Sequence, residues 1–186
     1  MRVWRVLLRI SADLHELGGV QAIDATCMDR IKASQHFANR WDYVFEDVNN
    51  IALVDCETGV FITIHCSVRQ IHDSRIGWQL LLRNIDNLGT ILADKGYDWD
   101  LLRYRLHTVG VQTVIMHCEH EKLDIADNDL IVDTTYYQRS LIESAFFALK
   151  RRFGETPRAR TWYGQFREIV LKASVRNIEL ESRSTP

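Results

Sequence analysis

Strand-like and helix-like segments alternate along most of this chain, and their order restricts its fold more than any other feature. Segments rich in β-branched and apolar residues predict strands at 20–26, 51–55, 60–66, 90–93 and 111–116. Apolar residues at helical spacing predict helices at 3–14, 73–88, 98–108, 135–153 and 162–180. Glu57-Thr58-Gly59 between the second and third strands indicates a hairpin. Three strands in a meander, followed by alternating helices and strands, predict an α/β fold with a mixed sheet.

This order of elements matches the ribonuclease-H-like (retroviral-integrase-like) fold, with helices flanking the sheet. We expect one domain over 1–186, because the chain has two prolines and no repeat, low-complexity stretch or Gly/Ser linker. Within it we expect a leading helix over 1–18, an irregular acidic insertion over 117–135 and C-terminal helices over 136–180. The polar and aromatic stretch 33–47 fits either a loop or an edge strand.

Composition excludes several classes of protein. Hydrophobic residues make up 46% and charged residues 26%, which is ordinary for a globular domain. No apolar run approaches the roughly eighteen residues that span a bilayer, and Arg2, Arg5 and Arg9 are unlike a secretory signal. The four cysteines form no CxxC pair, which favours reduced thiols. We therefore expect a cytoplasmic protein without a membrane partner.

The charge is unevenly distributed along the chain. Residues 1–135 hold 13 Lys/Arg against 20 Asp/Glu, whereas residues 136–186 hold 10 against 5. A basic final quarter favours an anionic partner at that end. Solvated helix faces are the alternative that charge alone leaves open.

Three carboxylates lie where the predicted fold would bring them together. Asp24 falls within an apolar strand, where a carboxylate is costly unless it is paired or bound to metal. Asp94 directly follows the fourth strand, at the edge where open α/β sheets bind ligands. Glu143 lies on the long helix after the fifth strand. Such oxygen ligands suit one or two Mg²⁺ or Mn²⁺ ions, and two ions can assist an in-line phosphoryl displacement.

The helix predicted at 135–153 carries a polar stripe apart from its apolar face. Tyr136, Arg139, Glu143 and Lys150 fall within a stripe roughly 60° wide. An acid with Tyr, Arg and Lys beside it is typical of a metal-binding Glu whose neighbours hold phosphate groups.

The spacing Tyr136-x2-Arg139-x3-Glu143-x6-Lys150 resembles the third-acid signature of DDE transposases of the insertion-sequence-four superfamily. LADKGYDWD, from Leu92 to Asp100, resembles the second-acid motif of this family, and AIDATCMDR, from Ala22 to Arg30, resembles the first. CETGVFITIHC, IHDSRIGWQLLLRN and RARTWYGQFREIVLKASVRNIE are similar to segments of insertion-sequence-five transposases of halophilic archaea. The resemblance extends from Val3 to Glu179.

This resemblance implies a transposase that cuts and joins DNA at the ends of a mobile element. Asp24, Asp94 and Glu143 would be the catalytic residues and the ligands of two Mg²⁺ or Mn²⁺ ions. The partner would be double-stranded DNA, bound by a homodimer assembled on it at the nucleoid. The residues expected to contact DNA are Tyr136, Arg139, Lys150, Lys95, Arg151, Arg152, Arg158 and Arg160. Lys95 could instead act on Asp94 through its positive charge. The four arginines from Arg151 to Arg160 could instead form a solvated basic face.

Members of this family usually carry a further helical segment before the catalytic domain, so the resemblance predicts an N-terminally truncated copy. A catalytically silent remnant that binds DNA or the intact transposase is therefore an alternative function. A host nuclease or junction resolvase on the same fold is another. His72-Asp73 opens the helix predicted at 73–88, where we expect Asp73 to cap it. His117-Cys118-Glu119-His120 could be a zinc site, although adjacent residues at a strand end point to opposite sides.

Overall fold

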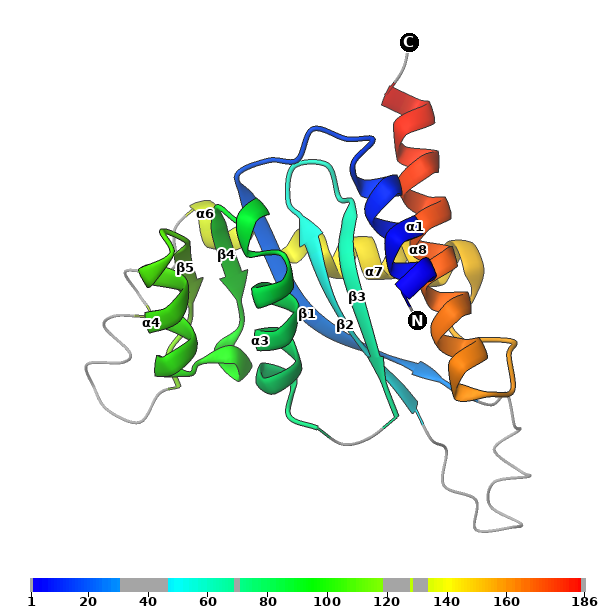
Figure 1. Cartoon of the computed structure of the whole chain (residues 1–186), viewed down its shortest axis with the longest axis horizontal. Helices are drawn as coiled ribbons and strands as arrows, with labels where there is room; N and C mark the ends of the chain where they lie inside the picture. The colour runs from blue at the N-terminus through cyan, green and yellow to red at the C-terminus, as the bar shows by residue number, and fades with distance from the viewer. Residues whose placement is uncertain (1, 31–46, 69–70, 119–127, 129–133, 185–186) are drawn as a thin grey trace.

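A five-stranded mixed sheet forms the centre of the molecule (Figure 1). The computed structural model describes residues 2–30, 47–68, 71–118, 128 and 134–184. Its strands are β1 (Val20–Asp29), β2 (Asp47–Asp55), β3 (Phe61–Ser67), β4 (Thr90–Ala93) and β5 (Gln112–Ile115). They lie in the order β3-β2-β1-β4-β5, with β1, β2 and β3 antiparallel and β4 and β5 parallel to β1. The predicted meander and mixed sheet are confirmed, and the fold is ribonuclease-H-like.

Helices cover both faces of this sheet (Figure 1). The helices are α1 (Arg2–Ala12), α3 (Asp73–Arg83), α4 (Asp100–Thr108), α6 (Thr134–Tyr137), α7 (Ser140–Phe153) and α8 (Trp162–Ser184), with short 3₁₀ turns η1 (Ile85–Asn87) and η2 (Lys95–Tyr97). One core cluster joins β-strand residues to α7, α8 and α1, and the other joins them to α3 and α4. Successive residues of β1 alternate between the two, because Ala22 belongs to the first cluster and Ile23 to the second.

The parallel pairing of β1 with β4 begins with a close backbone approach. The amide of Thr90 donates to the carbonyl oxygen of Gly19 over 2.7 Å, and the amide of Gln112 donates to that of Gly89 over 3.0 Å. A Cβ atom on Gly89 would collide with the backbone carbonyl of Gly19. Glycine at position 89 therefore allows the two strands to meet at this point.

Some of the predicted elements differ from those observed. The single helix predicted over 135–153 is wrong: α6 ends at Tyr137, and α7 begins at Ser140. The helix predicted over 73–88 ends at Arg83, and η1 follows it. Most of 33–47 and of the expected insertion over 117–135 lies outside the described residues. Within the part that is described, no helix combines the length and apolar character needed to cross a bilayer.

Candidate catalytic site

The pairing register of β1 and β4 brings two of the three predicted acids level with each other. Val20 pairs with Thr90, and Ala22 pairs with Leu92. Continuing this register by two residues places Asp24 opposite Asp94, and the two-residue periodicity of strands gives both the same facing. Both residues line one hollow of about 280 Å³. Two acids that are far apart in the sequence thus share a site.

Asp24 is mostly buried, with 18% of its side chain exposed. Its Oδ1 accepts a hydrogen bond from the amide of Ala25 over 2.8 Å, and its Oδ2 accepts one from Nη1 of Arg139 over 2.9 Å. Burial raises the pKa of Asp24, and the negative charges of Asp94 and Glu143 raise it further. The Ala25 amide and the Arg139 guanidinium oppose this change without cancelling it. The fold therefore concentrates more negative charge here than this single cation offsets.

Arg139 joins the first acid to the third. It precedes α7, and its Nη2 donates to Oε1 of Glu143, one turn further on, over 2.7 Å. The Glu143 side chain is 58% exposed, whereas that of Arg139 is 21% exposed. Burial alone would lower the pKa of Arg139, but the neighbouring charges, Asp24 first, raise it instead. The guanidinium is thus firmly charged and lies between Asp24 and Glu143.

The chemistry of these side chains fits a hard divalent cation. Carboxylate oxygens are the preferred ligands of Mg²⁺ and Mn²⁺, and Asp24 and Asp94 line the same hollow. No group of three or more His, Cys, Asp or Glu side chains within the described residues is close enough to hold one ion together. Glu143 instead makes its ion pair with Arg139. Arg139 thus engages both Asp24 and Glu143, whereas Oδ1 of Asp94 accepts from the amide of Gly96 over 2.9 Å.

Two further residues of the hollow were not predicted as site residues. Asp73 was expected to cap α3, but the N-cap position is His72, and Oδ1 of Asp73 accepts from the side-chain amide of Asn49 over 2.7 Å. Asp73 lines the hollow with Asp24 and Asp94. Tyr97 lines it too, and its buried hydroxyl has no hydrogen-bond partner in the part of the chain described. The sequence indicated Asp73 only as the start of a helix. It did not indicate that this third carboxylate lines the hollow.

The structure places the other predicted DNA contacts at various distances from the acids. Tyr136 belongs to α6, one turn before Arg139, and Lys95 is exposed directly after Asp94. Lys150 lies two turns beyond Glu143 on α7. Its positive charge opposes the rise in the pKa of Cys27, near the C-terminal end of β1, that burial causes. Of these residues, Tyr136 has a hydroxyl whose pKa is raised by burial, and it is close enough for the charges of Asp94 and Asp24 to raise that pKa further.

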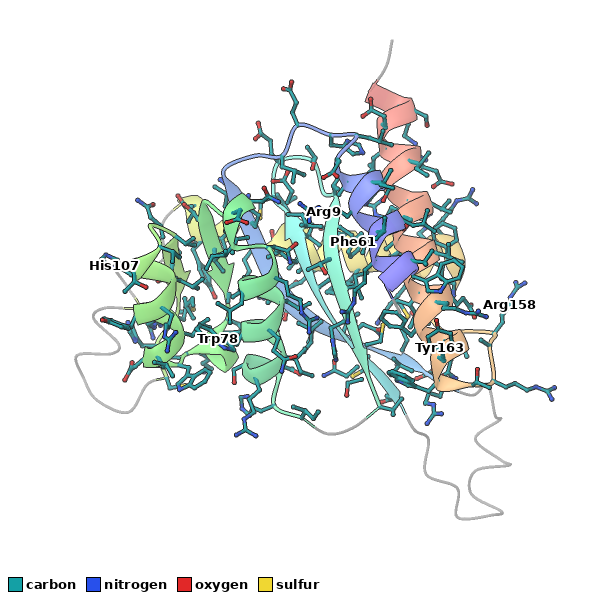
Figure 2. The ribbon with its side chains drawn as sticks, viewed as in Figure 1. Arg9, Phe61, Trp78, His107, Arg158 and Tyr163 are labelled. Carbon is teal, nitrogen blue, oxygen red and sulfur yellow. The ribbon has the colours of Figure 1, made fainter. Side chains whose placement is uncertain are left out.

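The four remaining arginines do not approach the acids. Arg151 and Arg152 occupy the last turn of α7, and Nη2 of Arg152 pairs with Oε1 of Glu179 over 2.9 Å. Arg158 and Arg160 precede α8, and Arg158 projects outward on the side of the molecule away from β4 (Figure 2). Any DNA contact by these residues would lie outside the cleavage position.

The expected alternative zinc ligands are only partly described, since Glu119 and His120 lie outside the described residues. Asp98 engages both of the others: Nδ1 of His117 lies 3.6 Å from its Oδ1, and the amide of Cys118 donates to its Oδ2 over 2.7 Å. Burial would raise the pKa of Asp98, but this amide and Arg103 lower it. His117 thus has a structural partner.

A mixed sheet of this order with flanking helices is the architecture of the ribonuclease-H-like class. Residues 16–178 match the family described as "Transposase DDE domain", and the chain belongs to that family. It is a DDE-type DNA transposase domain, a class that depends on divalent metal ions. The search of curated proteins found no match.

Among solved structures, the fold is similar to a piggyBac transposase in its synaptic complex with hairpin DNA. The TM-score is 0.63 at 8% sequence identity, over 98% of this chain and 51% of that one. The chain thus spans about half the length of that transposase. At this identity the likeness concerns the fold alone, and it agrees with the architecture of Figure 1.

Proposed function

We propose that this chain, as one domain over 1–186, cuts and joins DNA at the ends of an insertion sequence, with Asp24, Asp94 and Glu143 as its catalytic carboxylates. The observation that carries this proposal is the register that brings Asp24 and Asp94 level in one hollow. Family membership supports the reaction class. The motifs around the three acids favour the insertion-sequence-four and -five transposases, including those of halophilic archaea, as the subgroup.

Asp24 and Asp94 would hold one cation, and Glu143 would contribute to a second site. Two Mg²⁺ or Mn²⁺ ions, when bound, would supply activation of water and neutralisation of charge on the phosphate. Removing Asp24 or Asp94 therefore removes a metal ligand. Without the metal, the remaining carboxylates would repel the substrate phosphate.

The reaction would proceed in two displacements at phosphorus. In the first, a water oxygen forms a bond to phosphorus as the bond to the 3′ oxygen breaks, which leaves a 3′-hydroxyl and a 5′-phosphate. In the second, that 3′-hydroxyl oxygen forms the new bond to a phosphorus of target DNA, and the target's own 3′ oxygen leaves. Each step exchanges one phosphate ester or water oxygen for another, so no oxidant or nucleotide cofactor is needed.

Arg139 would contact first the two carboxylates and then a DNA phosphate in this scheme. Without metal it neutralises Asp24 and Glu143 through its two contacts. Once both acids bind metal, its guanidinium would be released to form a bidentate contact with a DNA phosphate. Tyr136, Lys150 and Lys95 lie near enough to the acids along the chain to contact neighbouring phosphates of the same end.

The DNA partner and the assembly follow from the same proposal. The piggyBac transposase of similar fold is a synaptic complex with DNA, which supports double-stranded DNA as the partner here. Joining two ends of one element requires two active sites, so we propose a homodimer assembled on DNA. In the cell the protein would then associate with the nucleoid.

The test is the nicking of a supercoiled plasmid that carries candidate inverted repeats. The intact chain is compared with Asp24→Asn, Glu143→Gln and the exposed loop acid variant Glu155→Gln, with Mg²⁺, Mn²⁺ or chelator. We expect metal-dependent nicking by the wild type and by Glu155→Gln, and a loss of at least a hundredfold in the other two. Nicking that persists in Asp24→Asn would refute the site. DNA binding without cleavage by the wild type would instead favour a regulatory remnant.

A further inference from the structure

A second hollow, far along α7 from the acids, is lined by a group of arginines. It has a volume of about 390 Å³ and lies between the C-terminal halves of α7 and α8. The arginines are Arg151, Arg152, Arg176 and Arg183. Glu179 is the one carboxylate among the described residues that line it. We call this feature the arginine hollow.

The positive charge of the arginine hollow is only partly neutralised. Glu179 is engaged by Arg152, whose Nε and Nη2 donate to Oε1 over 3.2 and 2.9 Å. Among the described residues, no carboxylate forms an ion pair with Arg151, Arg176 or Arg183 within 4.0 Å. None of these three guanidinium groups forms an ion pair with a described carboxylate, and Glu179 gives Arg176 and Arg183 only a more distant negative charge.

Arg176 is the member that surface solvation explains least. Its side chain is half-buried, and its buried Nε has no hydrogen-bond partner in the described structure. Burial lowers the pKa of Arg176, and the charge of Arg183 lowers it further. A basic residue in the last turn of a helix is favoured by the helix dipole, which accounts for Arg151, Arg152 and Arg183. Arg176 lies two turns before the end of α8, where the dipole offers no such support.

We propose that the arginine hollow binds phosphate groups of the DNA backbone, on a part of the duplex away from the cleaved bond. Arginine is the side chain best suited to bidentate contact with phosphate. Arg176 and Arg183 lie one above the other on α8, about 10 Å apart along the helix axis. Such spacing lets two groups contact separate phosphates, which fixes the register of a duplex without reading its sequence.

The arginine hollow and the acids lie close enough along α7 for one DNA duplex to contact both. Arg151 follows Glu143 by eight residues on the same helix, which is about 12 Å along its axis. The inference rests on the proposed function, because it gives the arginine hollow the same DNA that the acids would cleave. It adds Arg176 and Arg183, which the sequence motifs do not single out.

The test measures binding of a fluorescein-labelled duplex to the full chain by anisotropy, in chelator so that no cleavage occurs, over a series of KCl concentrations. The double variant Arg176→Gln/Arg183→Gln is compared with Arg83→Gln/Arg105→Gln, which removes the same charge from α3 and α4 on the opposite face of the sheet. Each lost phosphate contact reduces the slope of log K against log salt by about 0.9, so the first variant should lose about 1.8. The second should keep the wild-type slope.

Thermal denaturation of Arg183→Gln separates binding from folding. Arg183 repels Arg176 but is favoured by the helix dipole and by Glu179, so this variant should keep a Tm close to that of the wild type and still bind DNA more weakly. Equal slopes for wild type and Arg176→Gln/Arg183→Gln would overturn the inference while leaving the catalytic proposal standing. An Arg183→Gln chain that is unfolded at the temperature of the binding assay would assign these arginines a structural role and overturn it too. A wild-type chain that binds no duplex would overturn both proposals.

Discussion

Arg139 and Asp24 are 115 residues apart in the sequence, yet Nη1 of one lies 2.9 Å from Oδ2 of the other. The same guanidinium contacts Glu143, so one cation joins two acids that the proposed reaction would place on metal ions. A positive charge is needed here because three carboxylates line the neighbouring hollow. The arginine provides it in the metal-free protein.

Arg139→Gln should therefore destabilise the metal-free protein. The pair is largely buried, so losing the cation leaves Asp24 ionised and poorly compensated, at a cost of about 1–3 kcal/mol. Urea denaturation in chelator measures this, with the exposed Arg158→Gln as the control. Excess Mg²⁺ should reduce the difference, because the ion replaces the lost positive charge. A difference that stays the same with Mg²⁺ would separate Arg139 from the metal site.

Asp24→Asn should show a pH dependence of opposite sign to that of a salt-bridged surface acid. Because its folded pKa is raised, mainly by burial, Asp24 favours folding below its unfolded pKa and loses that contribution as the pH rises through the folded value. In chelator, the wild type should therefore gain stability relative to Asp24→Asn as the pH falls from 7 toward 4. Denaturation curves at several pH values test this, and a relative loss on acidification would contradict it.

Glu168→Gln should show the reverse behaviour. Burial would raise the pKa of Glu168, but the backbone amides of Arg158 and Ala159 and the side chain of Lys172 lower it. The stabilising contribution is present above the unfolded pKa of about 4.3 and disappears as the pH falls through the folded value. We expect Glu168→Gln to cost about 1–2 kcal/mol near neutral pH and progressively less as the pH falls below the unfolded pKa. Glu155→Gln, on the exposed loop whose Arg158 and Ala159 amides donate to Glu168, is the control.

Tyr97→Phe should leave the metal-free protein as stable as the wild type, or more stable by about 1 kcal/mol. The Tyr97 residue is 2% exposed, and its hydroxyl has no partner within the described chain, so removing it relieves an uncompensated desolvation cost. Tyr104→Phe, at 67% exposure, is the matched control. A loss above about 1 kcal/mol in thermal or urea denaturation would reveal a partner for this hydroxyl.

Periodicity and turn residues predict most of the strands and helices because these signals are local. The sequence also predicts Asp24 and Asp94 as neighbours, since a parallel pairing of their strands leaves them at one edge. The break between α6 and α7 is different, because Gln138 and Arg139 are good helix formers and neither is the Gly or Pro that would indicate a break. Arg139 contacts Asp24 across the fold, and helix propensity contains no information about such a contact. Asp73 was likewise predicted only as a helix cap, because its place in the hollow with Asp94 depends on the folded sheet.

The pairing of β1 with β4 also determines at which stage of synthesis the proposed site can form. β1 is made early, but it needs β4 for its parallel neighbour and α7 for Arg139 and Glu143. Contacts between segments so distant in sequence form late, because the entropy of closing the intervening loop must first be overcome. A growing or partly folded chain thus has acids but no assembled site. The proposed DNA cleavage would then become possible only after synthesis has passed α7, when the fold is nearly complete.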